Sequence, residues 1–191
     1  MILRRFVLTL AVLSLAFSAR PTFGYRLGGA LVAPYSGENG VICTACHFGG
    51  NVPMVAFSGP MSVTPGATKI FTFTVQSGDP SRQIAAGFDV ATNGGTFQAI
   101  NGQDEQVVDN GMNLSHNMVP KNNNANGVAA WNFKWTAPTA AGIYTFWGAG
   151  NSVNLNGDLT GDNAAGTTYS ITVGNPPTPS ATPPPTDTPT P

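Results

Sequence analysis

The sequence predicts an all-β fold, an antiparallel β-sandwich, and three observations support it. The 191 residues include 23 Gly and 16 Pro, two residue types that weaken helices and form turns. Several segments alternate apolar and polar residues with the period of two that a half-buried strand requires. Beyond the N-terminal apolar segment, no window of about 11 residues has the apolar spacing of a helix. The crossover helices of a parallel sheet are therefore not expected.

The clearest expected strand spans 69–75, where Phe71, Phe73 and Val75 occupy one face. Six further segments are rich in β-branched or aromatic residues and are bounded by Gly, Pro, Asn or Asp. These expected strands are 52–57, 84–91, 96–100, 131–135, 143–148 and 168–173. Seven or eight short strands at such spacing are typical of a sandwich of two sheets.

The two ends of the chain differ from this central part. Arg4 and Arg5 precede an apolar run at 6–17, and small residues follow, which is the pattern of a secretory signal peptide. Cleavage is expected after Gly24, with Ser18 as the alternative, so the protein is expected in the periplasm or at the cell surface. Residues 175–191 alternate Pro and Thr. This composition predicts an extended stalk that could attach the domain to the envelope, or a free tail.

The charge of the chain excludes one class of partner. Only 8 basic and 9 acidic residues are present, or 9% charged residues, where an average domain has about 25%. A nucleic-acid binder built on basic patches is therefore not expected. The sequence also lacks a G-x-S-x-G elbow, an H-E-x-x-H motif and a paired-carboxylate motif, so an enzyme is not predicted.

The residues that carry chemistry form the run Cys43-Thr44-Ala45-Cys46-His47. A C-x-x-C-H motif is typical of covalent c-type haem, because the two thiols add to the vinyl groups and the adjacent His ligates the iron. The run uses both cysteines and one of the two histidines of the chain. It predicts one haem c per chain, with Cys43 and Cys46 as attachment sites and His47 as an iron ligand.

Two other interpretations of the run stay open. A redox-active dithiol or a disulfide needs no adjacent His, and a thioredoxin-like βαβ context is not predicted. A zinc site could use Cys43, Cys46, His47 and His116, although thiols exported from the cytoplasm are prone to oxidation.

The second axial ligand of a haem must come from elsewhere in the chain. His116 is the leading candidate, because it is the other histidine, and a bis-His pair would give a lower potential than a His/Met pair. Met118 is the alternative Met ligand, since it would share a face with His116 on an extended segment. An open sixth position is the third possibility.

Two composition-based sites are discounted. The segment 151–162 is rich in Asn and Asp, as calcium sites are, but it has no closing bidentate Glu and resembles a turn. A cluster of aromatic side chains is expected mainly in the core, with some members as walls for the haem. Its members are Trp131, Trp135, Tyr144, Phe146 and Trp147.

Three segments resemble the reeler-like domains of bacterial exported proteins that carry various C-terminal anchors. These are Tyr35-Ser36-Gly37-Glu38 running into CTACHFGG, the W-x-F-x-W-x-A-P strand at 131–138, and the glycine- and asparagine-rich segment at 144–162. The resemblance covers about 34–174. It implies a reeler-type, immunoglobulin-like β-sandwich, and it places His116 where family members carry a His in a T-H-T-like stretch. Here Ser115 and Asn117 replace the two threonines.

These observations divide the chain into a signal peptide at 1–24, a haem-attachment segment at 25–52, a sandwich at 53–174 and a stalk at 175–191. The main hypothesis is an exported monohaem cytochrome that passes single electrons between redox proteins or small donors and acceptors. The alternative is a surface adhesion or ligand-binding sandwich in which the haem is structural or the two cysteines form a disulfide. The sequence leaves open whether the chain forms a homo-oligomer.

Overall fold

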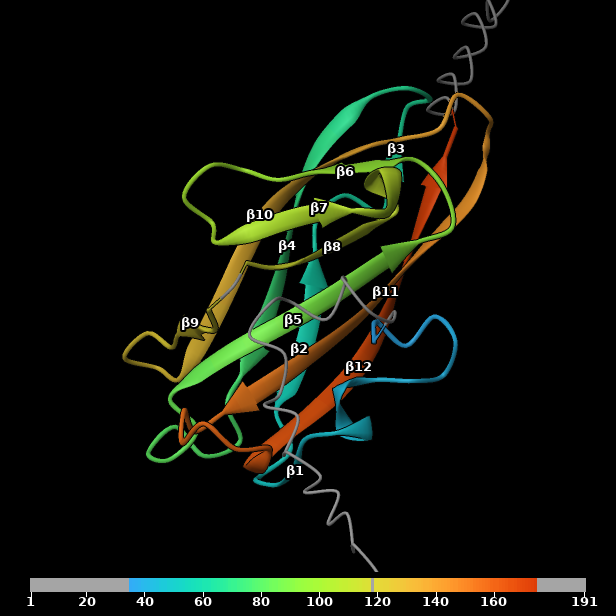
Figure 1. Cartoon of the computed structure of the whole chain (residues 1–191). Coiled ribbons are helices and arrows are strands. Elements are labelled where there is room, and N and C mark those ends of the chain that lie inside the picture. The colour runs from blue at the N-terminus through green and yellow to red at the C-terminus, as the bar shows by residue number, and fades with distance from the viewer. Residues whose placement is uncertain (1–34, 118, 175–191) are drawn as a thin grey trace, which may run out of the picture.

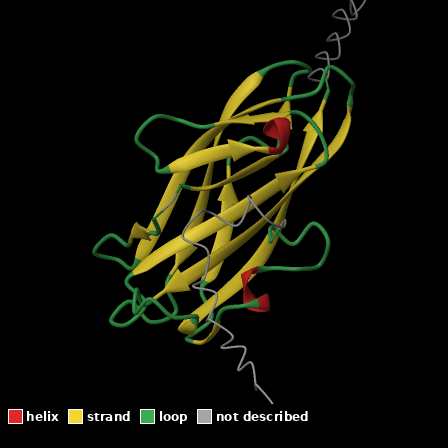
Figure 2. Cartoon of the chain, in the orientation of Figure 1, coloured by secondary structure: helices red, strands yellow, loops and turns green. Residues whose placement is uncertain are grey.

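The computed structural model describes residues 35–117 and 119–174, which form two packed β-sheets (Figure 1). The expected signal peptide, the stalk and Met118 lie outside the described residues. In the described part, no helix is long and apolar enough to cross a membrane. The helical elements that it contains are two short 3-10 turns, η2 (Cys43–Ala45) and η3 (Asp109–Gly111), as Figure 2 shows.

The larger sheet has the strand order β1-β12-β11-β5-β8-β7. Its strands are β1 (Phe48–Gly49), β12 (Thr160–Val173), β11 (Gly142–Val153), β5 (Ala85–Thr92), β8 (Asn113–His116) and β7 (Glu105–Val108). Two short strands lie off this path: β3 (Ser62–Val63) pairs with β12, and β9 (Lys121–Asn122) pairs with β5. The pairs β1–β12 and β3–β12 are parallel, and the other pairs in this sheet are antiparallel.

The smaller sheet has the order β2-β4-β10-β6 and is antiparallel throughout. Its strands are β2 (Met54–Ser58), β4 (Thr68–Gln76), β10 (Val128–Thr136) and β6 (Thr96–Gln98). Residues of β4 alternate between buried and partly exposed positions, as the sequence predicts. Hydroxyl and amide side chains pair across its outer face, for example Thr72 Oγ1, which donates to Asn132 Oδ1 at 2.7 Å.

The core between the two sheets is aromatic. Phe71, Phe133 and Phe146 are fully buried, and the ring of Phe146 contacts Phe71 edge-on at a centroid distance of 5.1 Å. Trp131 and Trp135 are also fully buried. The aromatic cluster expected in the core is therefore there, with Tyr144 packed against it. The predicted all-β sandwich is confirmed, while its specific reeler type stays a prediction.

Two regions differ from the expected strand pattern. β11 and β12 are longer than the segments predicted at 143–148 and 168–173, so most of 151–162 belongs to these strands and to the hairpin between them. β7 and β8 were not predicted, because the polar sequence at 105–116 lacks strict alternation. Pairing with β5 and burial of Leu114 specify β8 despite this sequence.

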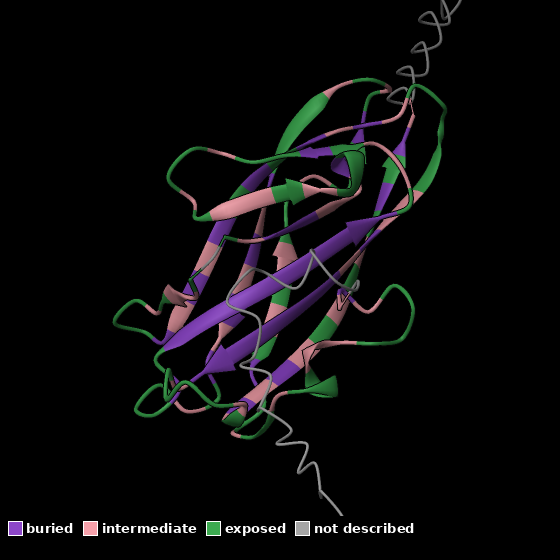
Figure 3. Ribbon diagram, viewed as in Figure 1, coloured by how far each residue is buried: buried purple, intermediate pink, exposed green. Residues whose placement is uncertain are grey.

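The outer face of the larger sheet is built from small side chains on its central strands. Phe88 and Val90 of β5 point into the core, so Gly87 and Asp89 face outward. All eight residues of β5 are nevertheless buried, and Figure 3 shows this strand buried along its length, next to the largely buried β11. This outer face carries the residues described next.

Candidate functional site

The Cys43–His47 loop lies over the outer face of β11 and β12, with which η2 is in contact. A single 3-10 turn folds the loop back on itself, since the main-chain N–H groups of Cys46 and His47 both donate to the carbonyl of Cys43. β1 follows directly and pairs in parallel with β12, and the Gly50 N–H donates to the Asp162 carbonyl at 2.9 Å. The edge of the large sheet therefore fixes the C-terminal end of the loop.

His47 contacts a buried carboxylate. Its Nδ1 lies 2.9 Å from Oδ2 of Asp162, whose residue is only 2% exposed. A carboxylate accepts hydrogen bonds, so Nδ1 carries the proton and donates it. The other ring nitrogen, Nε2, is then unprotonated and has a lone pair for a metal. The structure thus gives His47 the tautomer that an iron ligand needs.

The hairpin between β11 and β12 holds Asp162 in place. The Asn154 N–H donates to Asp162 Oδ1 at 2.9 Å. Within the hairpin, Asn154 Oδ1 accepts from the Asn156 N–H at 3.0 Å, and Asn156 Oδ1 accepts from the Asp158 N–H at 2.8 Å. These side chains accept hydrogen bonds from the main chain of the turn.

The two cysteines do not form a disulfide. Cys43 is half-buried and Cys46 is exposed. Burial raises the pKa of the Cys43 thiol to about 12, with a smaller contribution from the negative charge of Asp89. Because reactive dithiols have a lowered thiol pKa, this direction disfavours the redox-dithiol interpretation. The contribution of Asp89, a residue of β5, also indicates that Cys43 lies near that strand.

His116 ends β8, and its ring lies against the neighbouring strand β5. Its Nδ1 lies 3.1 Å from the main-chain nitrogen of Phe88 and 3.0 Å from its carbonyl oxygen. The ring covers Gly87, where an added Cβ would stand 2.8 Å from Cε1 and 3.0 Å from Nδ1. Glycine in the middle of β5 therefore makes room for the imidazole.

Electrostatics connect the two histidines. Burial lowers the pKa of His116, the Phe88 hydrogen bond opposes this, and the charge of His47 lowers the pKa further. The net lowering favours the neutral imidazole, which is the form that ligates a metal.

The outer face of β5 and β11 contains two buried polar side chains, each with one oxygen that has no hydrogen-bond partner among the described residues. In register across the sheet, Gly87 lies opposite Asn151, and Asp89 lies opposite Ala149. Asp89 is 2% exposed and accepts from the Tyr35 N–H through Oδ2, and burial raises its pKa to about 6. Asp89 Oδ1 and Asn151 Oδ1 have no hydrogen-bond partner among the described residues. Buried oxygens of this kind are rare unless a water or a bound group satisfies them.

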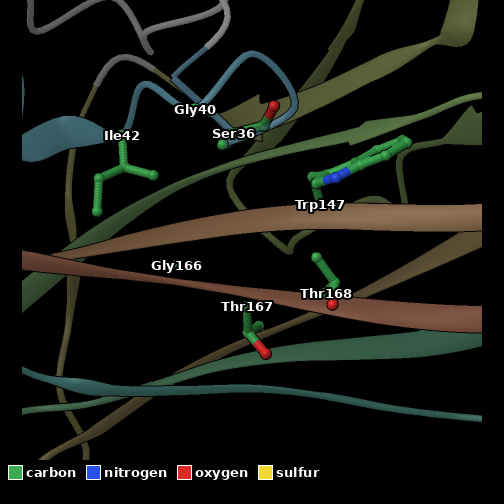
Figure 4. A pocket seen from close by; sticks show the side chains of 8 residues that line it. Ser36, Gly40, Ile42, Trp147, Gly166, Thr167 and Thr168 are labelled. Atoms are coloured by element: carbon green, nitrogen blue, oxygen red, sulfur yellow. The ribbon is translucent and has the colours of Figure 1, made fainter.

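A groove of about 510 Å³ adjoins the Cys43–His47 loop. Ser36, Gly40 and Ile42 form one wall, and Trp147 with Gly166 lies on the sheet below (Figure 4). Trp147 is therefore the one member of the predicted aromatic cluster that stands on the outer face beside the motif, while the others belong to the core or pack against it.

The structure places Cys43, Cys46 and His47 beside β11 and β12, while His116 lies at the end of β8, against Gly87 and Phe88 of β5. Among residues 35–117 and 119–174, however, no group of three or more His, Cys, Asp or Glu side chains converges in the way that metal ligands do. The zinc hypothesis therefore gains no support from this arrangement.

Sequence reasoning missed the supporting residues Gly87, Asp89 and Asp162. A glycine inside an expected strand often marks a place where another group approaches the backbone closely, so the sequence could have indicated Gly87. No local pattern could have indicated Asp162, because its contact with His47 spans 115 positions of the chain.

A scan against protein-family models found no match, and a search of curated proteins found no relative. Solved structures similar to this chain are β-sandwich domains. A CARDB domain from Pyrococcus furiosus is 20% identical, with 66% of this chain and 97% of that chain covered and a TM-score of 0.35.

A fimbrial subunit, AggA from Escherichia coli, is 15% identical, with coverages of 66% and 97% and a TM-score of 0.36. A cohesin module from Clostridium perfringens is 9% identical, with coverages of 64% and 97% and a TM-score of 0.42. The likeness concerns the sandwich architecture alone.

Proposed function

We propose that this protein is an exported monohaem c-type cytochrome that transfers single electrons at the periplasmic face or the cell surface. The observation that carries the proposal is the placement of two histidines from distant parts of the chain. His47, beside two unpaired thiols, donates Nδ1–H to Asp162, and His116 at the end of β8 lies against Gly87 of the neighbouring strand β5.

These residues fit a covalently held haem. Both cysteines are free, His47 presents Nε2, and His116 favours its neutral form. Asp89 and Asn151 contribute buried oxygens that lack partners among the described residues. A bound haem supplies an iron that alternates between the ferric and ferrous states by one electron.

Each residue has a distinct part in this proposal. Cys43 and Cys46 would provide the thioether attachments, and His47 would provide one nitrogen ligand to the iron. His116 would provide a second nitrogen ligand, and Gly87 leaves the space in which its ring lies. Soluble donors and acceptors, or redox proteins, would exchange electrons at the exposed side of the loop, where Cys46 lies.

The first test is an absorption spectrum with pyridine haemochrome analysis on the full chain, coexpressed with a cytochrome c maturation system. We expect a c-type haem that resists acid-acetone extraction in the wild type and in Thr44→Ala, which alters an exposed position between the cysteines. Cys43→Ser with Cys46→Ser should abolish attachment. His116→Ala should convert a low-spin spectrum to a high-spin one.

A folded but colourless wild type would contradict the cytochrome proposal. The adhesion or ligand-binding sandwich would then become the leading hypothesis. A coloured protein that ascorbate or dithionite cannot reduce reversibly would mean that the haem is structural, which is the other form of that alternative.

A further inference from the structure

The hydrogen bond between His47 and Asp162 joins two side chains that are largely shielded from solvent. Asp162 is buried, and the side chain of His47 keeps only 24% of its surface exposed. The ion pairs of the described residues are His47–Asp162 and Arg82–Asp79. Within that part of the chain, Asp162 therefore forms no ion pair with a lysine or arginine, and the imidazole of His47 is the side chain that its Oδ2 contacts.

The carboxylate of Asp162 is also held rigidly. Oδ1 accepts from the Asn154 N–H, which leaves Oδ2 directed at His47. The main chain of Asp162 is fixed at the same time, because its carbonyl accepts from Gly50 and β1 pairs alongside it. Two independent contacts thus join the loop to Asp162: the hydrogen bond from His47 to the carboxylate, and the one from Gly50 to the main-chain carbonyl.

A rigid, buried carboxylate on Nδ1 raises the electron-donating power of the opposite nitrogen, Nε2. A more strongly donating ligand favours the ferric ion over the ferrous ion, because the ferric ion carries the higher charge. His116 differs in this respect, since its Nδ1 meets the neutral main chain of Phe88. The two candidate ligands, His47 and His116, are therefore electronically unequal.

We propose that Asp162 is a positioning residue that fixes His47 as the Nδ1-protonated tautomer and lowers the reduction potential of the haem through it. The inference rests on the proposed function, since it concerns the iron that His47 would ligate. It goes further in assigning the control of the potential to a single carboxylate outside the C-x-x-C-H motif.

Asp162→Asn is the informative substitution, because it removes the charge and keeps the shape of the side chain. Asp158→Asn is the matched control, since it removes the same charge from an exposed position of the same hairpin. Both variants of the full chain are compared with the wild type in two measurements. The first is the ¹⁵N chemical shifts of His47 in protein produced without haem, and the second is a spectroelectrochemical titration of the haem-loaded protein.

In the haem-free protein, we expect a protonated Nδ1 in the wild type and in Asp158→Asn, and a mixture of tautomers in Asp162→Asn. In the loaded protein, Asp162→Asn should raise the ferrous-to-ferric ratio at a fixed potential at least tenfold, which equals about 59 mV for one electron. Asp158→Asn should change this ratio less than twofold.

The outcomes separate the two proposals. If the wild type carries haem but Asp162→Asn has the potential of Asp158→Asn, the role of Asp162 is overturned and the cytochrome stands. An unchanged tautomer in haem-free Asp162→Asn would overturn that role as well. If Asp162→Asn fails to fold, Asp162→Glu is the second variant, because it keeps the charge but displaces the carboxylate from Nδ1 of His47. The proposal then survives only if Asp162→Glu raises the potential relative to Asp158→Asn. A wild type that never binds haem would overturn the proposed function itself.

Discussion

Substitution of Gly87 by alanine tests how the sheet accommodates His116. The backbone of Gly87 is not in the left-handed region, so an alanine meets no conformational penalty there. Its Cβ would nevertheless stand 2.8 Å from His116 Cε1 and 3.0 Å from both ring nitrogens. Carbon atoms pack at about 3.5 to 4.0 Å, so the ring must move by several tenths of an ångström or more.

The magnitude follows from two opposing effects. Overpacking a buried site costs about 1 to 3 kcal/mol, and the displaced ring would weaken its hydrogen bond to Phe88, worth about 0.5 to 1.5 kcal/mol. Replacing a strand glycine by alanine returns about 0.5 to 1 kcal/mol. We expect a net loss of about 0.5 to 4 kcal/mol in the free energy of unfolding.

Gly142→Ala is the matched control, because Gly142 begins β11 and an added Cβ there would find its nearest neighbour at 3.6 Å. This variant should be neutral or more stable by up to about 1 kcal/mol. Urea unfolding followed by tryptophan fluorescence gives both values, and the His116 ring signals in NMR spectra report the displacement. Equal stability of the two variants, with unmoved His116 signals, would refute the placement of the ring over Gly87.

Two further predictions concern buried acids. Burial raises the pKa of Glu105 from 4.5 to about 7, so the folded state keeps a proton that the unfolded state has lost. Stability should therefore fall as pH rises through this window, and urea unfolding at its two ends should show a smaller fall in Glu105→Gln. Asp89→Asn should lower the pKa of Cys43 below about 12, since the charge of Asp89 helps to raise it. In a Cys46→Ser background, haem-free Asp89→Asn should thus react faster with iodoacetamide at a fixed alkaline pH, and an equal rate would contradict the proximity of Asp89 to Cys43.

The sequence predicted those strands whose two faces differ in polarity. In β4 and β10, alternate residues are aromatic or β-branched, and the pattern alone specifies which face is buried. β8 lacks this alternation, because its main contribution to the core is Leu114 and its remaining residues are polar. Its strand conformation depends on pairing with β5 and β7, which no local pattern reveals.

The candidate site likewise has one part that the sequence predicts and another that only the fold brings together. Cys43, Cys46 and His47 are contiguous, so their spacing in the sequence already indicates a chemistry. Asp162 contacts His47 only because β1 pairs in parallel with β12, a pairing of two residues that local propensity does not predict. The segment that contains Asp162 has the composition of a turn, and the structure adds that this turn also orients a buried carboxylate.

The two faces of β5 explain how a sandwich can carry such a site without losing its core. The inner face contributes Phe88 and Val90 to the aromatic packing, which fixes the strand firmly. The outer face can therefore consist of Gly87, Asp89 and small neighbours, whose side chains contribute little to packing. Because a strand sends alternate residues to opposite faces, the two requirements do not compete for the same positions. A substitution on the outer face, such as Gly87→Ala, should thus displace the His116 ring while the aromatic core keeps its packing.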